Sequence, residues 1–199
     1  MSAEPIMDTE KKKMQQHSTK QNTKAKQVIE LRAEMVSASS FARFGQLVMP
    51  AEDGAPYDAE RDAQLDLANG KPRFYIMRLR DRASDAGTMC FDNITHHARV
   101  TQCLGGLGQH SWFMAVAEPG SDPDEANMHV FEIPPGTFVK LHVGTWHAGP
   151  YFTQKEMDFY NLELVDTNVV DHNIKRFDTE GKEFVIIEAS LSSPTPSSS

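Results

Sequence analysis

The sequence predicts a mainly β protein, either an antiparallel sandwich or a small barrel, with few short helices. Two observations lead to this class. Apolar and aromatic residues occur in short runs along most of the chain, and turn dipeptides separate these runs at short intervals. The clearest turns are Ala86-Gly87, Gly105-Gly106, Pro119-Gly120 and Pro135-Gly136. Short strands at this spacing are typical of all-β domains.

The predicted elements begin with a strand over residues 28–35. Ser39 or Ser40 caps a helical turn that runs to Phe44 and ends at Gly45. Residues 50–72 combine prolines, glycines and many acidic residues, and this composition predicts a long loop. The other predicted strands cover residues 46–49, 73–80, 88–93, 96–104, 111–117, 129–134, 137–143, 157–165 and 183–189.

Length and composition predict one globular domain with polar ends. The chain has 199 residues, of which 39% are hydrophobic and 24% are charged. Residues 1–26 are polar and nearly free of aliphatic side chains, so we expect them to form a disordered leader. Residues 27–190 are expected to form the single β domain, and the Ser- and Pro-rich segment 191–199 a disordered tail.

Charge and cysteine content limit the possible functions of the protein and its possible cellular compartments. The net charge of −8 combines +3 in residues 1–27 with −11 in the remainder, and so acidic a domain repels a nucleic-acid backbone. No run of about 18 apolar residues occurs, which argues against a membrane span. The chain has two cysteines, Cys90 and Cys103, and its start does not resemble a secretory signal, so we expect a reducing, cytoplasmic location.

Six of the eight histidines lie between residues 96 and 147, and two of these six bracket a Gly-Thr-Trp turn. His142 and His147 stand on either side of this turn, which can place both imidazoles at the mouth of a barrel. Imidazole accepts and returns a proton near neutral pH, so both histidines are candidates for acid–base catalysis. The alternative is that Trp146 is a core aromatic residue and His147 bonds a backbone carbonyl.

Lys140 precedes His142 by two residues, so the two side chains share one face of a strand. Lys140 can therefore hold a substrate carboxylate beside an acid–base histidine. The alternative is a solvated surface lysine. Arg73 and Arg78 are further candidates for binding the carboxylate.

A bound divalent metal ion is a further possibility, because imidazoles bind Zn, Ni, Cu and Fe. The candidate ligands are His96, His97 and His142. Adjacent strand residues point to opposite faces, so only one of His96 and His97 can join a site inside a barrel. The sequence therefore leaves open whether a cofactor is bound.

Glu163 lies in the predicted strand 157–165 and shares a face with Phe159 and Asn161. Its carboxylate can act as an acid or a base, or it can be a surface charge. Cys103 has no basic partner in the sequence pattern, which predicts an inert buried thiol.

Several segments carry motifs that belong together. Residues 41–48 (FARFGQLV) contain Phe-x-x-Phe-Gly, residues 97–102 contain His-x-x-x-x-Gln, and residues 140–150 (KLHVGTWHAGP) contain Trp-His before a proline. Segments 72–79, 157–164 and 167–172 extend the similarity, which covers about residues 28–178. Together these motifs resemble the ureidoglycolate lyase family, and most closely its plant and algal branch.

The resemblance implies a cupin-like β-barrel, commonly a homodimer, that cleaves ureidoglycolate to glyoxylate and urea in allantoin breakdown, a part of purine catabolism. Four residues match the family pattern: His97, Gln102, Trp146 and His147. The chain departs from the bacterial members at Thr95-His96, where they carry an acidic residue and an arginine. Lys140 or His96 would then have to replace that arginine as the group that binds the carboxylate.

For this reaction we expect His147 and His142 to transfer protons and Lys140 to hold the substrate carboxylate. The residues expected to contact the substrate besides these are His97, Gln102, Trp146 and Glu163. An amidohydrolase that releases ammonia and CO₂ is the alternative reaction, and it would need an activated water and hence a metal. A non-catalytic, cupin-like protein that binds a small molecule is the alternative class.

Overall fold

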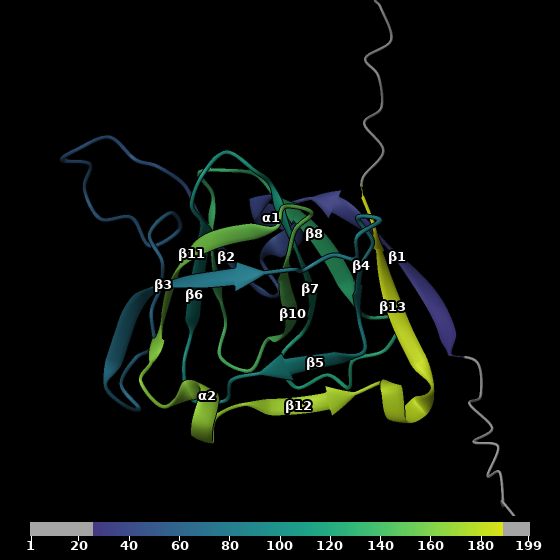
Figure 1. The fold of residues 1–199 in the computed structure, drawn as a ribbon. Coiled ribbons are helices and arrows are strands. Elements are labelled where there is room, and N and C mark those ends of the chain that lie inside the picture. The colour runs from purple at the N-terminus through teal and green to yellow at the C-terminus, as the bar shows by residue number, and fades with distance from the viewer. Residues whose placement is uncertain (1–25, 189–199) are drawn as a thin grey trace, which may run out of the picture.

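Two β-sheets form the framework of the structure, a computed structural model that describes residues 26–188 (Figure 1). The five-stranded sheet has the spatial order β2 (Gly45–Val48), β9 (Phe138–Leu141), β6 (Gln102–Gly106), β11 (Glu156–Leu164) and β3 (Pro72–Arg80). The eight-stranded sheet has the order β12 (Asn173–Arg176), β5 (Asn93–His96), β10 (Trp146–Tyr151), β7 (Trp112–Ala117), β8 (His129–Ile133), β1 (Gln27–Met35), β13 (Lys182–Ile187) and β4 (Met89–Phe91). In the described part of the chain the helices are short: α1 (Ala38–Phe41), α2 (Thr167–Val170) and the 3-10 helix Asp178–Glu180.

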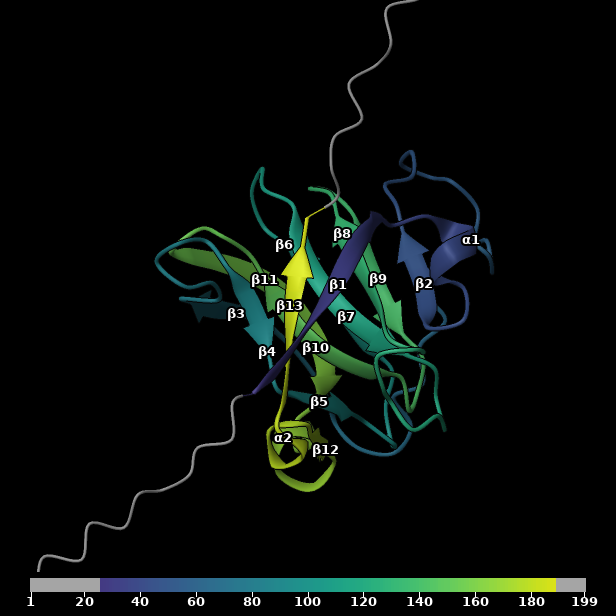
Figure 2. The same ribbon diagram turned by 90° about the vertical axis from the view of Figure 1, so that its right-hand side faces the viewer.

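The predicted fold class, a mainly β barrel or sandwich with few short helices, is confirmed. One part of the antiparallel prediction is wrong, because β1 runs parallel to both of its neighbours, β8 and β13. β1 is the first strand of the domain, and no hairpin joins it to either neighbour, so no tight turn imposes an antiparallel direction. Figure 2 shows β1 and β13 side by side at the front of the molecule.

β7 lies within the larger sheet, and all six of its residues are buried. Trp112 and Met114 pack between the two sheets, where the Trp112 ring meets Phe159 of β11 edge-on. Phe113 points to the other face and joins a second apolar cluster with Phe184 of β13. Because both faces are covered, β7 is a continuous apolar run (WFMAVA) without polar alternation.

The predicted strand 96–104 is wrong, because β5 ends at His96 and β6 begins at Gln102. Part of the intervening backbone bonds to a side chain instead of a neighbouring strand. The Asp171 carboxylate accepts hydrogen bonds of 2.8 Å from the backbone N–H groups of both Ala98 and Arg99. Asp171 lies 73 residues beyond Ala98, so no local sequence pattern could indicate this break.

β10 and β12 are absent from the predicted strands. β10 contains Gly149 and Pro150, which normally mark a turn. Its pairing with β7 shifts register between Ala148 and Tyr151, so the two residues occupy a bulge within the strand. β12 is a mostly exposed strand at the edge of its sheet, without a clear apolar alternation.

Helix α1 is capped by Ser37 and not by the predicted Ser39 or Ser40. The Ser37 hydroxyl accepts a hydrogen bond of 3.1 Å from the backbone N–H of Ser40. The Ser40 hydroxyl in turn accepts one from the backbone N–H of Ser37, which completes a capping box. The helix ends at Phe41, three residues before the predicted end.

Residues 1–25 of the predicted leader and the whole predicted tail lie outside the described residues, as do residues 189 and 190, which were expected to belong to the domain. Lys26 is the one described residue of the predicted leader, and its Nζ lies 3.3 Å from the carboxylates of Asp92 and Glu183. Between residues 26 and 188 no helix is long and apolar enough to cross a membrane.

Candidate active site

A polar cavity of about 270 Å³ is lined by strands β3, β6 and β11 of the smaller sheet and by β5 and β10 of the larger one. The alternation of each strand decides which side chains face it. Asn161 and Glu163 of β11 face the cavity from one strand, as Tyr75 does from β3. The lining also includes Arg82, His97, Gln102, His147, Asn168 and His172.

Glu163 is the acceptor in a dense hydrogen-bond network, and its side chain is 1% exposed. Oε2 accepts hydrogen bonds from Gln102 Nε2 at 3.1 Å and from Asn161 Nδ2 at 3.2 Å. Oε1 accepts hydrogen bonds from the Tyr75 hydroxyl at 3.3 Å and from Asn168 Nδ2 at 3.2 Å. Four donors therefore hold this carboxylate in one position, and it is not the surface charge that the sequence left as an alternative.

His147 projects from β10 into the cavity and is buried. Its Nδ1 lies 3.1 Å from the carbonyl oxygen of Thr145, so Nδ1 carries the hydrogen and Nε2 keeps its lone pair. Burial lowers the pKa of His147 to about 3, and the neighbouring His97 contributes to the same shift. At neutral pH His147 is therefore an uncharged imidazole with an acceptor nitrogen.

His97 lies beside His147, with the two ring centroids 5.0 Å apart. Nδ1 of His97 is 2.6 Å from the carbonyl oxygen of Asp171, which leaves its Nε2 as a second acceptor. His172 lies near His97, at 5.9 Å between ring centroids, and burial lowers its pKa. Three imidazoles therefore cluster at the cavity, and Asp171 positions one of them.

The depressed pKa of His147 predicts that the protein loses stability in mild acid. The unfolded chain binds a proton at His147 below its usual pKa of 6.5, whereas the folded chain does so only near pH 3. The free energy of unfolding should thus be highest above about pH 6.5 and fall steadily as the pH approaches 4. Urea unfolding across this range measures it, and His147→Gln should flatten the slope. An unchanged slope in the variant would contradict the buried, neutral state of His147.

Gln102 and Arg82 each offer the cavity a polar group that no other residue between 26 and 188 bonds. Gln102 donates through Nε2 to Asn161 and Glu163, which leaves its buried Oε1 without a hydrogen bond. Arg82 lines the cavity, and no ion pair within the described part of the chain uses its guanidinium. A ligand that carries both an N–H donor and a carboxylate would satisfy both groups.

The arginines proposed from the sequence are already committed to other partners. Arg73 lies over the Tyr75 ring, 3.6 Å from its centroid, and its Nη1 is 3.7 Å from Glu163 Oε1. Arg78 donates two hydrogen bonds of 2.8 Å to Asp158. Arg82 is therefore the cavity arginine best placed to bind a carboxylate.

Lys140 and His142 do not line the cavity. Val139 and Leu141 of β9 point into the core and are 0% and 2% exposed, so strand alternation turns Lys140 and His142 to the outer face. There Lys140 Nζ lies 3.0 Å from His142 Nδ1, in agreement with the expected shared face. The structure thus separates this pair from His147, the other histidine expected to transfer protons.

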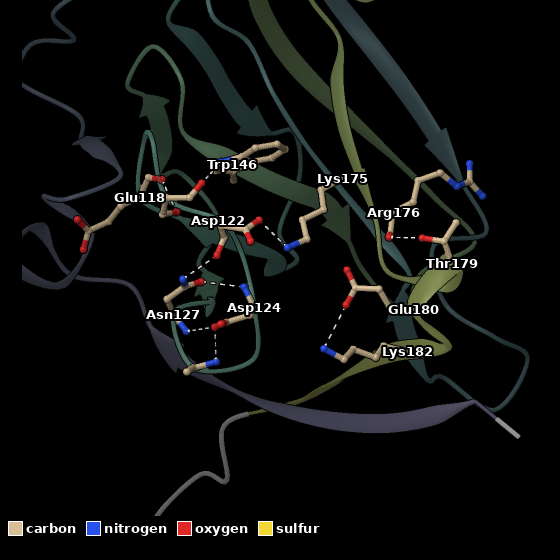
Figure 3. A network of polar contacts seen from close by, with 12 residues as sticks. Glu118, Asp122, Asp124, Asn127, Trp146, Lys175, Arg176, Thr179, Glu180 and Lys182 are labelled. Atoms are coloured by element: carbon tan, nitrogen blue, oxygen red, sulfur yellow. Dashed lines mark hydrogen bonds and ion pairs between the residues drawn. The ribbon is translucent and has the colours of Figure 1, made fainter.

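Trp146 is also absent from the cavity lining. Figure 3 shows its indole next to the segment that carries Glu118 and Asp122. Its indole Nε1 donates a hydrogen bond of 3.0 Å to the carbonyl oxygen of Ser121. Its ring meets the His96 ring edge-on, with 4.2 Å between centroids. Trp146 and His96 therefore pack together outside the cavity, while the next residue on β10, His147, faces into it.

The three candidate metal ligands lie in different surroundings. His96 packs on Trp146, His97 faces the cavity and His142 lies on the outer face of β9. Among residues 26–188, no group of three or more His, Cys, Asp or Glu side chains has a geometry suited to a metal ion. His97 and His147, each with Nδ1 bonded to a carbonyl oxygen, are the cavity residues that would offer Nε2 to such an ion.

Sequence reasoning missed several cavity residues. Arg82 follows the end of β3, where nothing in the sequence marks it. Asn168 and His172 belong to the polar segment that contains α2, and this segment folds back onto the cavity. Strand alternation does indicate that Tyr75 points to the face opposite Phe74. Phe74 is 66% exposed in the structure, so the Tyr75 face is the inner one that borders the cavity.

The fold and the cavity together define a β protein with a polar cavity of a size that suits a small molecule. The family model described as ureidoglycolate lyase matches residues 28–185, so the chain belongs to the ureidoglycolate lyase family. A search of curated proteins gives no significant match. Among solved structures, the chain is similar to a dTDP sugar isomerase from Desulfovibrio desulfuricans G20, with a TM-score of 0.38 and 14% identity over 69% of this chain and 87% of that chain.

Proposed function

We propose that this protein is a carbon–nitrogen lyase that cleaves ureidoglycolate to glyoxylate and urea, as a step of allantoin breakdown in the cytoplasm. Membership of the ureidoglycolate lyase family supports the substrate class. The observation that carries the proposal is the cavity itself. It combines a neutral histidine, a buried amide oxygen without a partner and an arginine that no described carboxylate pairs with.

The chemistry of ureidoglycolate matches these groups. The molecule is a small carboxylate whose carbinol carbon carries a hydroxyl and a ureido group. In the proposed complex Arg82 holds the carboxylate. Gln102 Oε1, which has no donor among the described residues, accepts a hydrogen bond from a ureido N–H. Glu163 fixes the orientation of the Gln102 amide through the bond to Nε2.

His147 is the proposed proton-transfer residue. Nε2 takes the proton of the carbinol hydroxyl, the carbon–oxygen bond becomes a carbonyl, and the carbon–nitrogen bond breaks with its electron pair on the ureido nitrogen. That nitrogen then takes the proton back from the imidazolium, which gives glyoxylate and urea. Burial destabilises the imidazolium and so favours the return of the proton. His97, at 5.0 Å between ring centroids, is placed to assist the same transfer.

Product analysis tests the proposed reaction. The purified protein is incubated with ureidoglycolate, and urea, ammonia and glyoxylate are each measured. We expect equal amounts of urea and glyoxylate without ammonia. Ammonia and CO₂ would instead show the amidohydrolase reaction, and no product together with measurable binding would show a non-catalytic binding protein. The assay is repeated after dialysis against EDTA, and proton transfer by His147 alone predicts the same rate.

Arg82→Met should raise the KM for ureidoglycolate by about tenfold to a hundredfold, because one charge-assisted contact to the carboxylate is lost. The kcat should change less, since Arg82 does not touch the bond that breaks. Steady-state kinetics of urea release measure both values. Arg80→Met is a matched control, because Arg80 pairs with Glu156 outside the cavity lining. An unchanged KM in Arg82→Met would remove Arg82 from the site.

A homodimer is the proposed assembly, formed along the exposed edge of β3. β3 is the last strand of the smaller sheet, and Phe74 and Ile76 on it are 66% and 57% exposed. An exposed apolar strand at the edge of a sheet usually pairs with a strand of another chain or is covered by a helix or loop. Light scattering at micromolar concentration should give a dimer, and the double variant Phe74→Glu/Ile76→Glu a monomer. Leu65→Glu, on the exposed loop, is the control, and a monomeric native protein would refute the proposal.

A further inference from the structure

We propose that Lys140 and His142 form a second binding site, separate from the cavity, for a small monocarboxylate. The site is a cleft of about 620 Å³ on the outer face of the smaller sheet, and both residues line it. Gln46 of β2 pairs in register with Lys140 of β9, and Figure 2 shows these two strands side by side. The Gln46 side chain bonds Ala59 and Gln64 of the long loop, at 3.3 Å and 2.9 Å, so the loop lies over this face.

Lys140 is a buried cation that no carboxylate of the described residues contacts. The residue is only 2% exposed, yet within residues 26–188 no carboxylate lies within 4.0 Å of its Nζ. Four other lysines do contact a carboxylate, although all are more exposed: Lys26, Lys155, Lys175 and Lys182. An ammonium group buried without a negative partner is costly, and a bound anion would remove that cost.

The hydrogen bonds of the pair leave donors unused. Nε2 of His142 lies 3.2 Å from the carbonyl oxygen of Ala42 and so carries the hydrogen, which makes Nδ1 an acceptor for the ammonium group of Lys140. Lys140 thus uses one of its three N–H donors on a neutral partner. Two donors are left for a ligand, and a carboxylate with two oxygens can accept both.

The neighbouring thiol does not neutralise Lys140. Cys103 of β6 pairs in register with Lys140, but burial raises its pKa to about 11, so it carries no charge at neutral pH. Burial also lowers the pKa values of Lys140 and His142. The lowered pKa of Lys140 is the shift expected for an ammonium group that is buried with no carboxylate in contact among residues 26–188.

The lining favours a small monoanion. Small and apolar residues form much of the cleft, namely Ala38, Ala42, Leu47 and Ala59, and two amides, Gln46 and Gln64, add polar contacts. Glu60 also lines the cleft, and its carboxylate opposes a second negative charge on the ligand. A short carboxylate with an apolar or amide-bearing tail therefore fits better than phosphate.

The experiment uses the full-length protein and sodium propionate as the probe, with sodium chloride at matched ionic strength. Thermal unfolding should show a saturable rise in Tm with propionate, because a ligand that binds the folded state stabilises it. Lys140→Met should weaken propionate binding by about tenfold or more. His147→Gln, which alters the cavity, and Lys155→Met, which removes an exposed lysine, should bind propionate as the native protein does.

Several results would overturn the proposal. Retained propionate affinity in Lys140→Met, or loss of it in His147→Gln, would place the ligand elsewhere. An equal effect of inorganic phosphate or of neutral propionamide would refute the assignment to a monocarboxylate. If Lys140→Met does not fold, the ring signals of His142 in the native protein are followed by NMR. A saturable shift with propionate but not with propionamide supports the site, and the absence of a shift refutes it.

Discussion

His147→Gln is expected to lower kcat for urea release by about 10²-fold or more, with the fold intact. The imidazole Nε2 is the acceptor for the hydroxyl proton in the proposed reaction, and glutamine cannot take up that proton. The fold should survive because the glutamine amide can still donate to the carbonyl oxygen of Thr145, the partner of Nδ1 in the native protein.

Two measurements accompany the His147→Gln kinetics. Circular dichroism and thermal unfolding establish that the variant is folded, and His129→Gln is a matched control because His129 lies on β8, outside the cavity lining. Full activity in His147→Gln would show that the histidine only bonds the backbone, as the alternative interpretation of the sequence has it. Loss of activity together with unfolding would give the same conclusion.

Glu163→Gln is expected to cost roughly 3 kcal/mol of stability and to abolish most activity. Each carboxylate oxygen accepts two hydrogen bonds from side-chain donors. An amide puts an NH₂ group in place of one oxygen, where it faces two donors and leaves them unsatisfied. The Gln102 amide loses its fixed orientation, and with it the acceptor proposed for the ureido group.

The matched control for Glu163→Gln is Glu156→Gln on the same strand. Glu156 is the exposed first residue of β11, and its carboxylate pairs with Arg78 and Arg80. Its substitution should therefore change the free energy of unfolding by less than about 1 kcal/mol. Chemical unfolding and urea release are measured for both variants. Equal effects of the two substitutions would contradict the role of the buried network.

Strand periodicity accounts for the part of the site that the sequence could predict. A regular strand has a side-chain period of two, which predicts that Asn161 and Glu163 share a face and that Lys140 and His142 do too. What periodicity cannot tell is which face is the interior. For β11 the face with Glu163 borders the cavity, whereas for β9 the inward face carries Val139 and Leu141.

The rest of the site depends on contacts between distant segments. The backbone at Ala98 leaves the strand ladder because Asp171 binds it, and the same residue fixes the His97 ring. Arg82 reaches the cavity from beyond the end of β3, and His172 reaches it from the segment after α2. None of these placements has a local sequence signal, although the histidines themselves stand out in the sequence.

A crystal structure with oxalurate tests most directly whether the cavity is the site of ureidoglycolate cleavage. Oxalurate has the carboxylate and ureido groups of ureidoglycolate, but a carbonyl replaces the carbinol, so the elimination cannot occur. The account predicts oxalurate in the cavity, with its carboxylate on Arg82, a ureido N–H on Gln102 Oε1 and its central carbon next to His147. Oxalurate bound in the Lys140 cleft, with an empty cavity, would contradict it.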